Sequence, residues 1–599
     1  MSSVVRIGNA QGFWGDRGSA AAELLAREPD LDYLTLDYLA EVSLSIMAVQ
    51  RERDPNAGFA RDFVEVVRSL ADYFKNGGRC RIVTNAGGLN PHGCAAACVA
   101  ALAAAGCPAL SIAVVSGDDV LEALRGSEES EIASCKLQIA NCKFENLDSG
   151  RPLSDVRDRL VTANAYVGAA PIVEALRLGA DIVITGRIAD PSLTVAPCVH
   201  HFGWSLTDWD RLAGATVAGH LIECGVQVTG GISTDWLEVP DSAELSFPIV
   251  EVSDDGSCIV TKPVNAGGCV DERTVKEQLV YEIGNPDEYL SPDVTVSFLS
   301  LNVDDLGNDR VRVSGARGRP APQTLKVSAT YRDGFRAAGT LTIFGRNAVT
   351  KARRAGEIVL QRVRNAGFEL RDSFIECLGT GACVPVVPSM IDESQYLETV
   401  LRIAVESDDR AAVERFAREL MPLVTAGPQG TTGYAEGRPH PHPVFRYWPC
   451  LIERDRVHPC VELVSEAAVT RVTGGWALLP VSESERSVTR GTGKSAHPPF
   501  GRLTDLAYAR SGDKGTGANI GVVARTPQDY DTLVEELTAE RVGEYFGSMG
   551  VLEVIRYELP NLRALNFVVK GILSRPLRVD AQGKALGQAL LEMPWPPGK

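Results

Sequence analysis

The sequence has no long apolar run, no closely spaced cysteine pair and no excess of basic residues. No stretch reaches the roughly 18 apolar residues that a membrane-spanning helix needs, which argues against a membrane protein. The most apolar segment, residues 94–110, is interrupted by Gly106 and Pro108. Residues 1–8 show no signal-peptide pattern, so we expect a cytoplasmic protein.

Acidic residues outnumber basic ones by 77 to 60, which gives a formal net charge of −17. Such a surface repels phosphate backbones and anionic lipids, so we expect neither nucleic acid nor a membrane as a partner. The 14 cysteines are scattered and form no CxxC pair, so we expect most of them to be reduced and buried. The histidines lack the spacing of a ligand set, so we predict no metal site and no cofactor, although a need for a divalent cation stays open.

What the sequence does contain is enough apolar material for a large core, with 45% hydrophobic residues in a chain of 599. At roughly 150 residues per domain, this length predicts three or four domains. Strand-like and helix-like segments alternate over the first 235 residues, which predicts βαβ units around a mainly parallel sheet. We therefore expect residues 1–290 to form a Rossmann-like three-layer α/β domain. The predicted strands are residues 4–7, 33–38, 81–84, 110–115 and 181–184.

The later parts of the chain have different patterns. Residues 291–480 read as an α+β continuation, with expected strands at 294–301, 325–331 and 339–344 and a long helix at 350–367. Residues 481–500 are polar, with glycines and paired prolines, which is typical of a linker. Residues 501–599 suggest a small ferredoxin-like α+β domain, in the order strand, helix, strand, helix, strand, strand.

Polar residues and glycines gather where the predicted parallel strands end. In a parallel sheet, ligands bind beyond the carboxyl ends of the strands, so these segments predict a site. Glycine lets a ligand approach the backbone closely, while Asn, Asp and Arg provide orienting hydrogen bonds. The candidate catalytic residues are Asp37, Glu41, Asn85, Asn90, Arg187 and Asp190. The candidate residues for binding substrate or phosphate are Gly12, Gly15, Asp16, Gly87, Gly88, Thr185, Ser511 and Lys514.

Several of these residues have an ordinary structural explanation as well. Arg187 is suited to a carboxylate or phosphate, or else pairs with Asp190 and only shapes its loop. Asp37 and Glu41 form an acid and base pair, or else they are solvated or cap a helix. Around Gly8 the spacing matches neither GxGxxG nor a phosphate-binding Walker loop, so a dinucleotide site is not favoured.

Two further segments leave alternatives open. Residues 510–519 form either an anion-binding nest with Lys514 or a tight bend between two strands. Residues 282–289 form either a turn that joins domains or the edge of a cleft.

These segments resemble the acyclic terpene utilization protein AtuA family. The resemblance rests on residues 12–17, 37–41, 85–90, 185–193 and 281–289, and near the C-terminus on 511–515 and 556–567. It covers nearly the whole chain. One departure is at residues 571–578, where the family tends to show paired glycines and this chain has Ile572, Leu573 and Ser574.

The resemblance implies a role in acyclic terpene breakdown, in pathways that handle branched acyl-CoA thioesters and start from alcohols such as citronellol. We expect a homo-oligomeric enzyme of hydratase or lyase type, acting on a small anionic substrate such as a branched acyl-CoA or related acid. Arg187 would hold the anion, Asn85 and Asn90 would stabilise an oxyanion, and Asp37 or Glu41 would move the proton. The alternatives are a non-catalytic binding or assembly subunit and a nucleotide-dependent enzyme.

Overall fold

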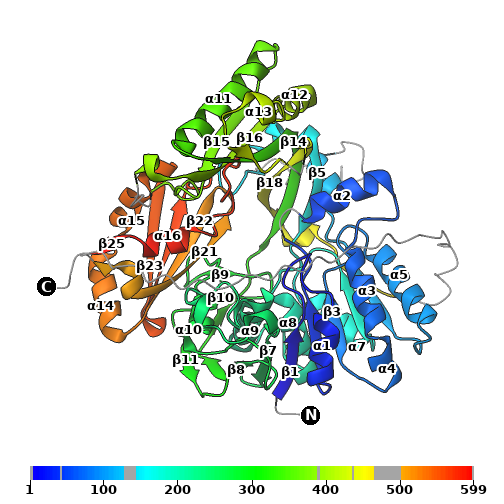
Figure 1. Ribbon diagram of the computed structural model, residues 1–599. Coiled ribbons are helices and arrows are strands. Elements are labelled where there is room, and N and C mark those ends of the chain that lie inside the picture. Colours follow the sequence, from blue (N-terminus) through cyan, green and yellow to red (C-terminus); the bar gives the residue numbers. More distant parts are fainter. Residues whose placement is uncertain are drawn as a thin grey trace.

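A computed structural model describes residues 4–40, 43–126, 144–386, 392–434, 437–464 and 501–595. The chain forms a mixed α/β structure with several sheets (Figure 1). The predicted linker, residues 481–500, lies outside the described residues. Within the described residues, no helix has the length and apolar character needed to cross a membrane.

The N-terminal half is organised around a ten-stranded sheet whose five central strands are parallel. In spatial order they are β1 (Val4–Asn9), β2 (Tyr33–Leu36), β3 (Arg81–Thr84), β6 (Ile182–Thr185) and β4 (Ile112–Ser116). All five were predicted from their apolar runs. The outer strands pair antiparallel, so the sheet is mixed rather than mainly parallel. They are β7 (Ile249–Ser253), β8 (Cys258–Thr261), β12 (Val311–Ser314), β11 (Asn302–Asp305) and β19 (Cys460–Val464).

The central strands read as continuous apolar runs because both faces of the sheet are buried. Val83 and Val183 point into one core, whereas Ile82 and Ile182 on the same strands point into a second core. Helices complete both cores. The first core includes side chains of α7 (Ala170–Arg177), α8 (Ser192–Phe202) and α9 (Trp209–Ile222). The second includes side chains of α1 (Ala20–Arg27), α2 (Ser43–Arg53), α3 (Arg61–Ser69), α4 (Ala71–Lys75) and α5 (Pro91–Ala104).

A second sheet is built on one very long strand, β14 (Thr324–Phe344). The expected strands 325–331 and 339–344 are two parts of it, so the prediction of two strands was wrong. The chain passes between them through a register shift from Arg332 to Phe335, where Gly334 has φ +81°. The partners of β14 are β5 (Leu160–Ala165), β16 (Glu398–Ser407), β17 (Thr431–Thr432) and β18 (His442–Glu453), and β15 (Asp372–Leu378) pairs with β16.

Two helices, α11 (Ala348–Asn365) and α12 (Arg410–Leu420), have buried faces toward this second sheet. The first of them matches the helix predicted at 350–367. The expected strand at 294–301 is only β10 (Thr295–Ser297), which pairs with β9 (Tyr289–Leu290) and β13 (Arg317–Arg319).

The C-terminal part has a four-stranded antiparallel sheet in the order β21-β22-β24-β23. Its elements are β21 (Ala507–Lys514), β22 (Gly517–Ala524), α14 (Pro527–Glu536), α15 (Ala539–Tyr545), β23 (Glu553–Leu559), β24 (Ala564–Lys570) and α16 (Leu586–Leu591). Two strands therefore come first, which corrects the predicted order. The reason is that residues 510–519 are a hairpin with a tight turn at Gly515 (φ +62°), which was one of the two alternatives for this segment.

The C-terminal sheet packs on α10 (Glu272–Leu279) and on the turn that follows it (Figure 1). Glu282 donates its backbone N–H to Asn519 Oδ1 at 2.7 Å, and Asn566 Nδ2 donates to the Gly284 carbonyl at 2.7 Å. Arg525 also binds Asp235 through two hydrogen bonds of 3.1 Å. The segment 282–289 is thus a turn that joins two parts of the chain.

Candidate functional site

Asp37 and Asn85 each follow directly after a strand, and their side chains meet. Leu36 and Thr84 are register partners in β2 and β3, so the next residue of each strand lies at the same edge of the sheet. Asn85 Nδ2 donates to Asp37 Oδ1 at 2.6 Å, and the backbone N–H of Leu39 donates to the same oxygen at 2.9 Å. Asn85 Oδ1 accepts from the Tyr38 N–H at 2.7 Å. Both ends of the Asn85 amide therefore fix the position of the Asp37 loop.

Arg187 follows β6 and is only 2% exposed. Its guanidinium donates to the Leu39 carbonyl and to Asp190 Oδ1, and it stacks 4.2 Å from the ring centre of Tyr166. The loop-shaping ion pair with Asp190 is therefore present. Asp190 keeps 35% of its side-chain surface exposed, so it is the accessible member of this cluster.

The Asp37 carboxyl lies in an environment that disfavours its charge. Burial raises the pKa of Asp37 well above its ordinary value, and the charge of Asp190 raises it further. Arg187 and the hydrogen bond from Asn85 act in the opposite direction without cancelling the rise in pKa. Asp190 is thus the carboxyl whose charge acts on Asp37 in the structure. Glu41, the predicted partner of Asp37, lies outside the described residues.

Asp118 and Asn164 extend this cluster and were not among the candidates. Asp118 Oδ2 accepts from the Arg187 N–H and from Asn164 Nδ2, both at 2.8 Å. Burial raises the pKa of Asp118 to about 6. Asp118 follows the end of a strand that the sequence predicted, whereas Asn164 lies in β5, a strand that was not predicted.

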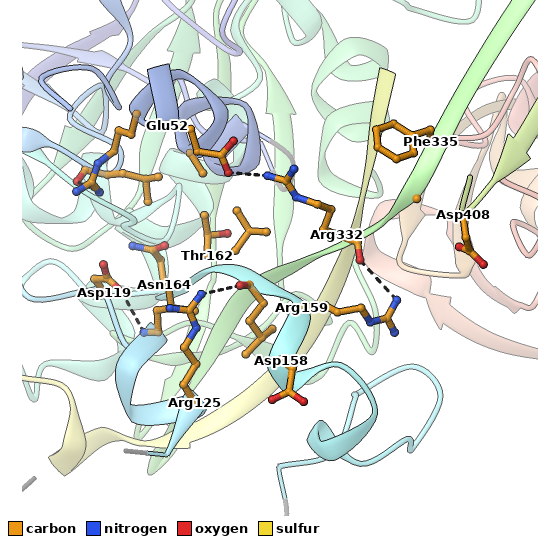
Figure 2. Close-up of a pocket in the computed structure, with 17 residues that line it drawn as sticks. Glu52, Asp119, Arg125, Asp158, Arg159, Thr162, Asn164, Arg332, Phe335 and Asp408 are labelled. Atoms are coloured by element: carbon orange, nitrogen blue, oxygen red, sulfur yellow. Dashed lines mark hydrogen bonds and ion pairs between the residues drawn. The ribbon is translucent and has the colours of Figure 1, made fainter. Parts of the chain in front are cut away.

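A cavity of about 780 Å³ opens beside Asn164 (Figure 2). Its walls come from α2, from the loops after β3 and β4, and from β5 and β14. Four arginines and four acids surround it, so its lining carries no net charge. Arg332 pairs with Glu52 at 2.5 Å across its rim. The lining residues are Ala48, Arg51, Glu52, Leu89, Asp119, Leu121, Arg125, Asp158, Arg159, Leu160, Val161, Thr162, Asn164, Arg332, Gly334, Phe335 and Asp408.

The first glycine loop is shaped by close backbone contact. A Cβ on Gly12 would lie 2.6 Å from the carbonyl carbon of Cys224, and Gly15 has φ +136°. Asp16 Oδ2 accepts from the Gly12 N–H at 2.8 Å, and burial raises the pKa of Asp16. These contacts explain the residues of this loop by packing against the turn after α9.

The second glycine loop is equally tight. A Cβ on Gly87 would lie 2.5 Å from the Thr185 carbonyl oxygen, and Gly88 has φ +49° with Met47 against it. Thr185 is fully buried, and its hydroxyl donates to the Gly186 carbonyl at 2.9 Å. The contact between Gly87 and Thr185 therefore holds the loops after β3 and β6 together.

The remaining candidates are engaged elsewhere. Asn90 caps α5, since its Oδ1 accepts from the Gly93 N–H at 2.9 Å and its Nδ2 donates to the carbonyls of Asn56 and Ala57. Ser511 donates to the Gly583 carbonyl at 2.7 Å and accepts from the Gly587 N–H at 2.8 Å. The side chain of Lys514 lies outside the described residues. Within the described ranges, no group of three or more His, Cys, Asp and Glu residues is arranged to hold a metal ion.

Comparison with known proteins assigns the chain to a family. The model described as "Acyclic terpene utilisation family protein AtuA" matches residues 5–463, and the model described as "AtuA ferredoxin-like domain" matches residues 501–596. No curated protein and no solved structure matches the chain. The family is linked to acyclic terpene utilisation, as its description says. Because the two models together cover nearly the whole sequence, the chain belongs to the acyclic terpene utilisation family AtuA, with that family's C-terminal ferredoxin-like domain.

Proposed function

We propose that this protein is an enzyme of acyclic terpene breakdown that moves a proton on a branched carboxylic acid or its CoA thioester. The reaction class is hydration or carbon–carbon cleavage, since both need a proton delivered or removed next to a carbonyl group. The observation that carries this proposal is the buried carboxyl of Asp37, whose pKa is raised well above its ordinary value.

A carboxyl with a raised pKa gives up its proton less readily than an ordinary aspartic acid, which suits it to general acid catalysis. The neighbouring Asp190 is half-buried and forms an ion pair with Arg187. Two carboxyls in such different environments are suited to opposite roles, one as the acid and the other as the base. Asn85 and Arg187 act as positioning residues, because their contacts hold Asp37 and Asp190 in place.

This assignment revises the expected role of Arg187. Its guanidinium is already bonded to Asp190 and Leu39, so it orients the carboxyls rather than gripping a substrate anion. The cavity of Figure 2 supports the choice of substrate class. Its volume of about 780 Å³ is in the range of small-molecule sites, and Leu89, Leu121 and Phe335 give it an apolar part suited to a branched chain.

The cavity is linked to the two carboxyls by hydrogen bonds. Asn164 lies in its wall and donates to Asp118, which in turn accepts from the backbone of Arg187. We infer that the substrate occupies this cavity and extends toward Asp190. We also propose a Rossmann-like three-layer arrangement for residues 1–290, supported by the separate cores on the two faces of the parallel strands.

A complementation experiment tests the proposed function. A terpene-degrading bacterium that lacks its own family member is grown on citronellol or on succinate, and its acyl-CoA pool is measured by mass spectrometry. We expect one branched acyl-CoA or acid to accumulate on citronellol only, and this chain to clear it. Asp37→Asn should fail to clear it, whereas Asp72→Asn, a change at a surface acid that pairs with Lys75, should clear it. Normal clearance by Asp37→Asn would contradict the proposal.

A further inference from the structure

Arg510 of β21 is a buried cation without a carboxylate partner. The side chain is only 4% exposed, and its Nη2 donates to Gln227 Oε1. Its other two nitrogens, Nε and Nη1, are buried and have no hydrogen-bond partner among the residues that the structure describes. Within the described part of the chain, no ion pair is found for Arg510. Buried charges in folded proteins are normally paired and hydrogen-bonded, so this guanidinium needs an explanation.

Two other cations that join the C-terminal part to the rest of the chain are paired with acids. Arg525 forms two hydrogen bonds with Asp235, each of 3.1 Å. Lys584 lies 2.9 Å from Glu282 and 3.5 Å from Asp513. Lys584 thus pairs with Glu282 and Asp513, whereas no ion pair of Arg510 is found within the described residues.

The surroundings of Arg510 come from two parts of the chain. The guanidinium carbon lies 4.7 Å from the ring centre of Tyr281. The turn after α9 is also close: burial and the charges of Glu223 and Glu282 raise the pKa of the Cys224 thiol well above its ordinary value, and the charge of Arg510 lowers it. This is the same turn that Gly12 packs against. Arg510 therefore lies where the C-terminal sheet meets the turn after α9.

The residues around Arg510 are less covered than Arg510 itself. Gln227, Cys224 and Asp513 are all half-buried, so solvent reaches this junction. The Gln227 amide bonds one edge of the guanidinium, and a shift of that half-buried side chain would uncover it. An anion that enters the junction then finds donors which no protein group uses.

We propose that Arg510 binds an oxyanion, the carboxylate or phosphate group of a ligand, at the junction between the C-terminal sheet and the turn after α9. The guanidinium provides a permanent positive charge and two unused N–H donors, which such a group accepts. The C-terminal domain thereby contributes a binding residue of its own. This proposal goes beyond the proposed function, because anion binding here does not depend on proton transfer at Asp37.

A thermal-unfolding experiment on the full chain tests the proposal, with sodium phosphate, sodium isovalerate or CoA added at constant ionic strength set by chloride. We expect a saturable rise in Tm with at least one of the three. A response to phosphate and CoA identifies a phosphate ligand, and a response to isovalerate identifies a carboxylate ligand. No rise with any of them, or a rise that is equal in Arg510→Met, overturns the proposal.

The variants separate binding from structural support. Without added anion, Arg510→Met should have the Tm of the wild type, because the change removes an unpaired charge. With added anion, its Tm should not rise. Arg525→Met should have a lower Tm but keep the rise, since Arg525 is paired with Asp235. Asp37→Asn should keep the rise, which separates this site from the proposed chemistry. If Arg510→Met does not fold, Arg510→Lys replaces it, with an expected loss of affinity of at least tenfold; unchanged affinity overturns the proposal.

Discussion

Asn85 donates a 2.6 Å hydrogen bond to the carboxylate of Asp37, and the two residues follow neighbouring strands of the parallel sheet. The same amide accepts from the backbone N–H of Tyr38, so it braces the loop on both sides of the carboxyl. Asn85 is itself fully buried. The position of Asp37 therefore depends on a single side chain of the adjacent strand end.

The first prediction concerns Asn85→Ala. It leaves a buried carboxyl oxygen and a buried N–H without this partner, so we expect the free energy of unfolding to fall by about 1–3 kcal/mol. Because the lost bond lowers the pKa of Asp37, that pKa should rise further. Urea denaturation followed by circular dichroism measures the stability. Asn365→Ala is the control, since Asn365 is exposed at the end of α11 and bonds only Gln361; its effect should stay within about 0.5 kcal/mol. Equal effects of both changes would exclude the bracing role.

The second prediction concerns the ion pair between the buried Arg187 and the half-buried Asp190. Arg187→Met removes the counterion of Asp190 and the donor to Leu39, so we expect a loss of about 3–5 kcal/mol in unfolding free energy. Asp190→Asn should cost less, because Asp190 is partly exposed. The loss of unfolding free energy in the double variant should be smaller than the sum of the two single losses by about 0.5–3 kcal/mol. Strictly additive losses would show that the pair does not act as a unit.

The third prediction concerns pH. Burial raises the pKa of Asp118 to about 6, from about 3.9 in an unfolded chain. The folded state therefore binds this proton more tightly, and Asp118 destabilises the fold increasingly as the pH rises from about 4 to about 6, with no further change above. Asp118→Asn should gain stability relative to the wild type over that window, by at most about 3 kcal/mol.

Thermal unfolding of both proteins between pH 4 and pH 8 measures this difference. Asp210→Asn serves as a control of opposite sign. A hydrogen bond from the Gly318 N–H, opposed by burial, lowers the pKa of Asp210, so that carboxylate stabilises the fold at neutral pH and loses its effect in acid. A constant difference between Asp118→Asn and the wild type would refute the assigned environment of Asp118.

The fourth prediction separates two glycines of the first loop. A methyl group on Gly12 would meet the backbone of Cys224 at 2.6 Å and Gly225 at 2.7 Å, so Gly12→Ala should destabilise the protein by about 1–3 kcal/mol. Gly18 lies in open space with nothing within 4 Å, so Gly18→Ala should have little effect. Melting temperatures of the two variants test this directly. Similar values would mean that the loop after β1 does not contact the turn after α9 as described.

Much of the parallel core was predictable, because apolar runs bounded by glycine and polar residues have few other interpretations. The proximity of Asp37 and Asn85 was also predictable, because each lies one residue beyond the end of one of two adjacent parallel strands. The influence of Asp190 on Asp37 was not predictable. It depends on how the Arg187 side chain folds back toward Leu39, which no local pattern encodes.

The errors in the fold have local causes as well. Arg332, Asp333 and Gly334 look like a turn, yet β14 continues through them with a shift in register. For residues 510–519 the sequence left open an anion-binding nest or a bend between two strands, and the segment forms a hairpin whose strands pair along their whole length. Arg510 was overlooked because a residue of a nest or bend is not expected to be buried.

The most direct test of proton transfer at Asp37 uses the compound that accumulates in the deletion strain. The purified protein is incubated with it in heavy water, and deuterium incorporation next to the carbonyl group is measured by mass spectrometry. The wild type should incorporate deuterium during turnover, and Asp37→Asn should do so about 10²–10⁴ times more slowly while its melting curve shows that it is folded. Incorporation by Asp37→Asn at the wild-type rate would contradict the central claim.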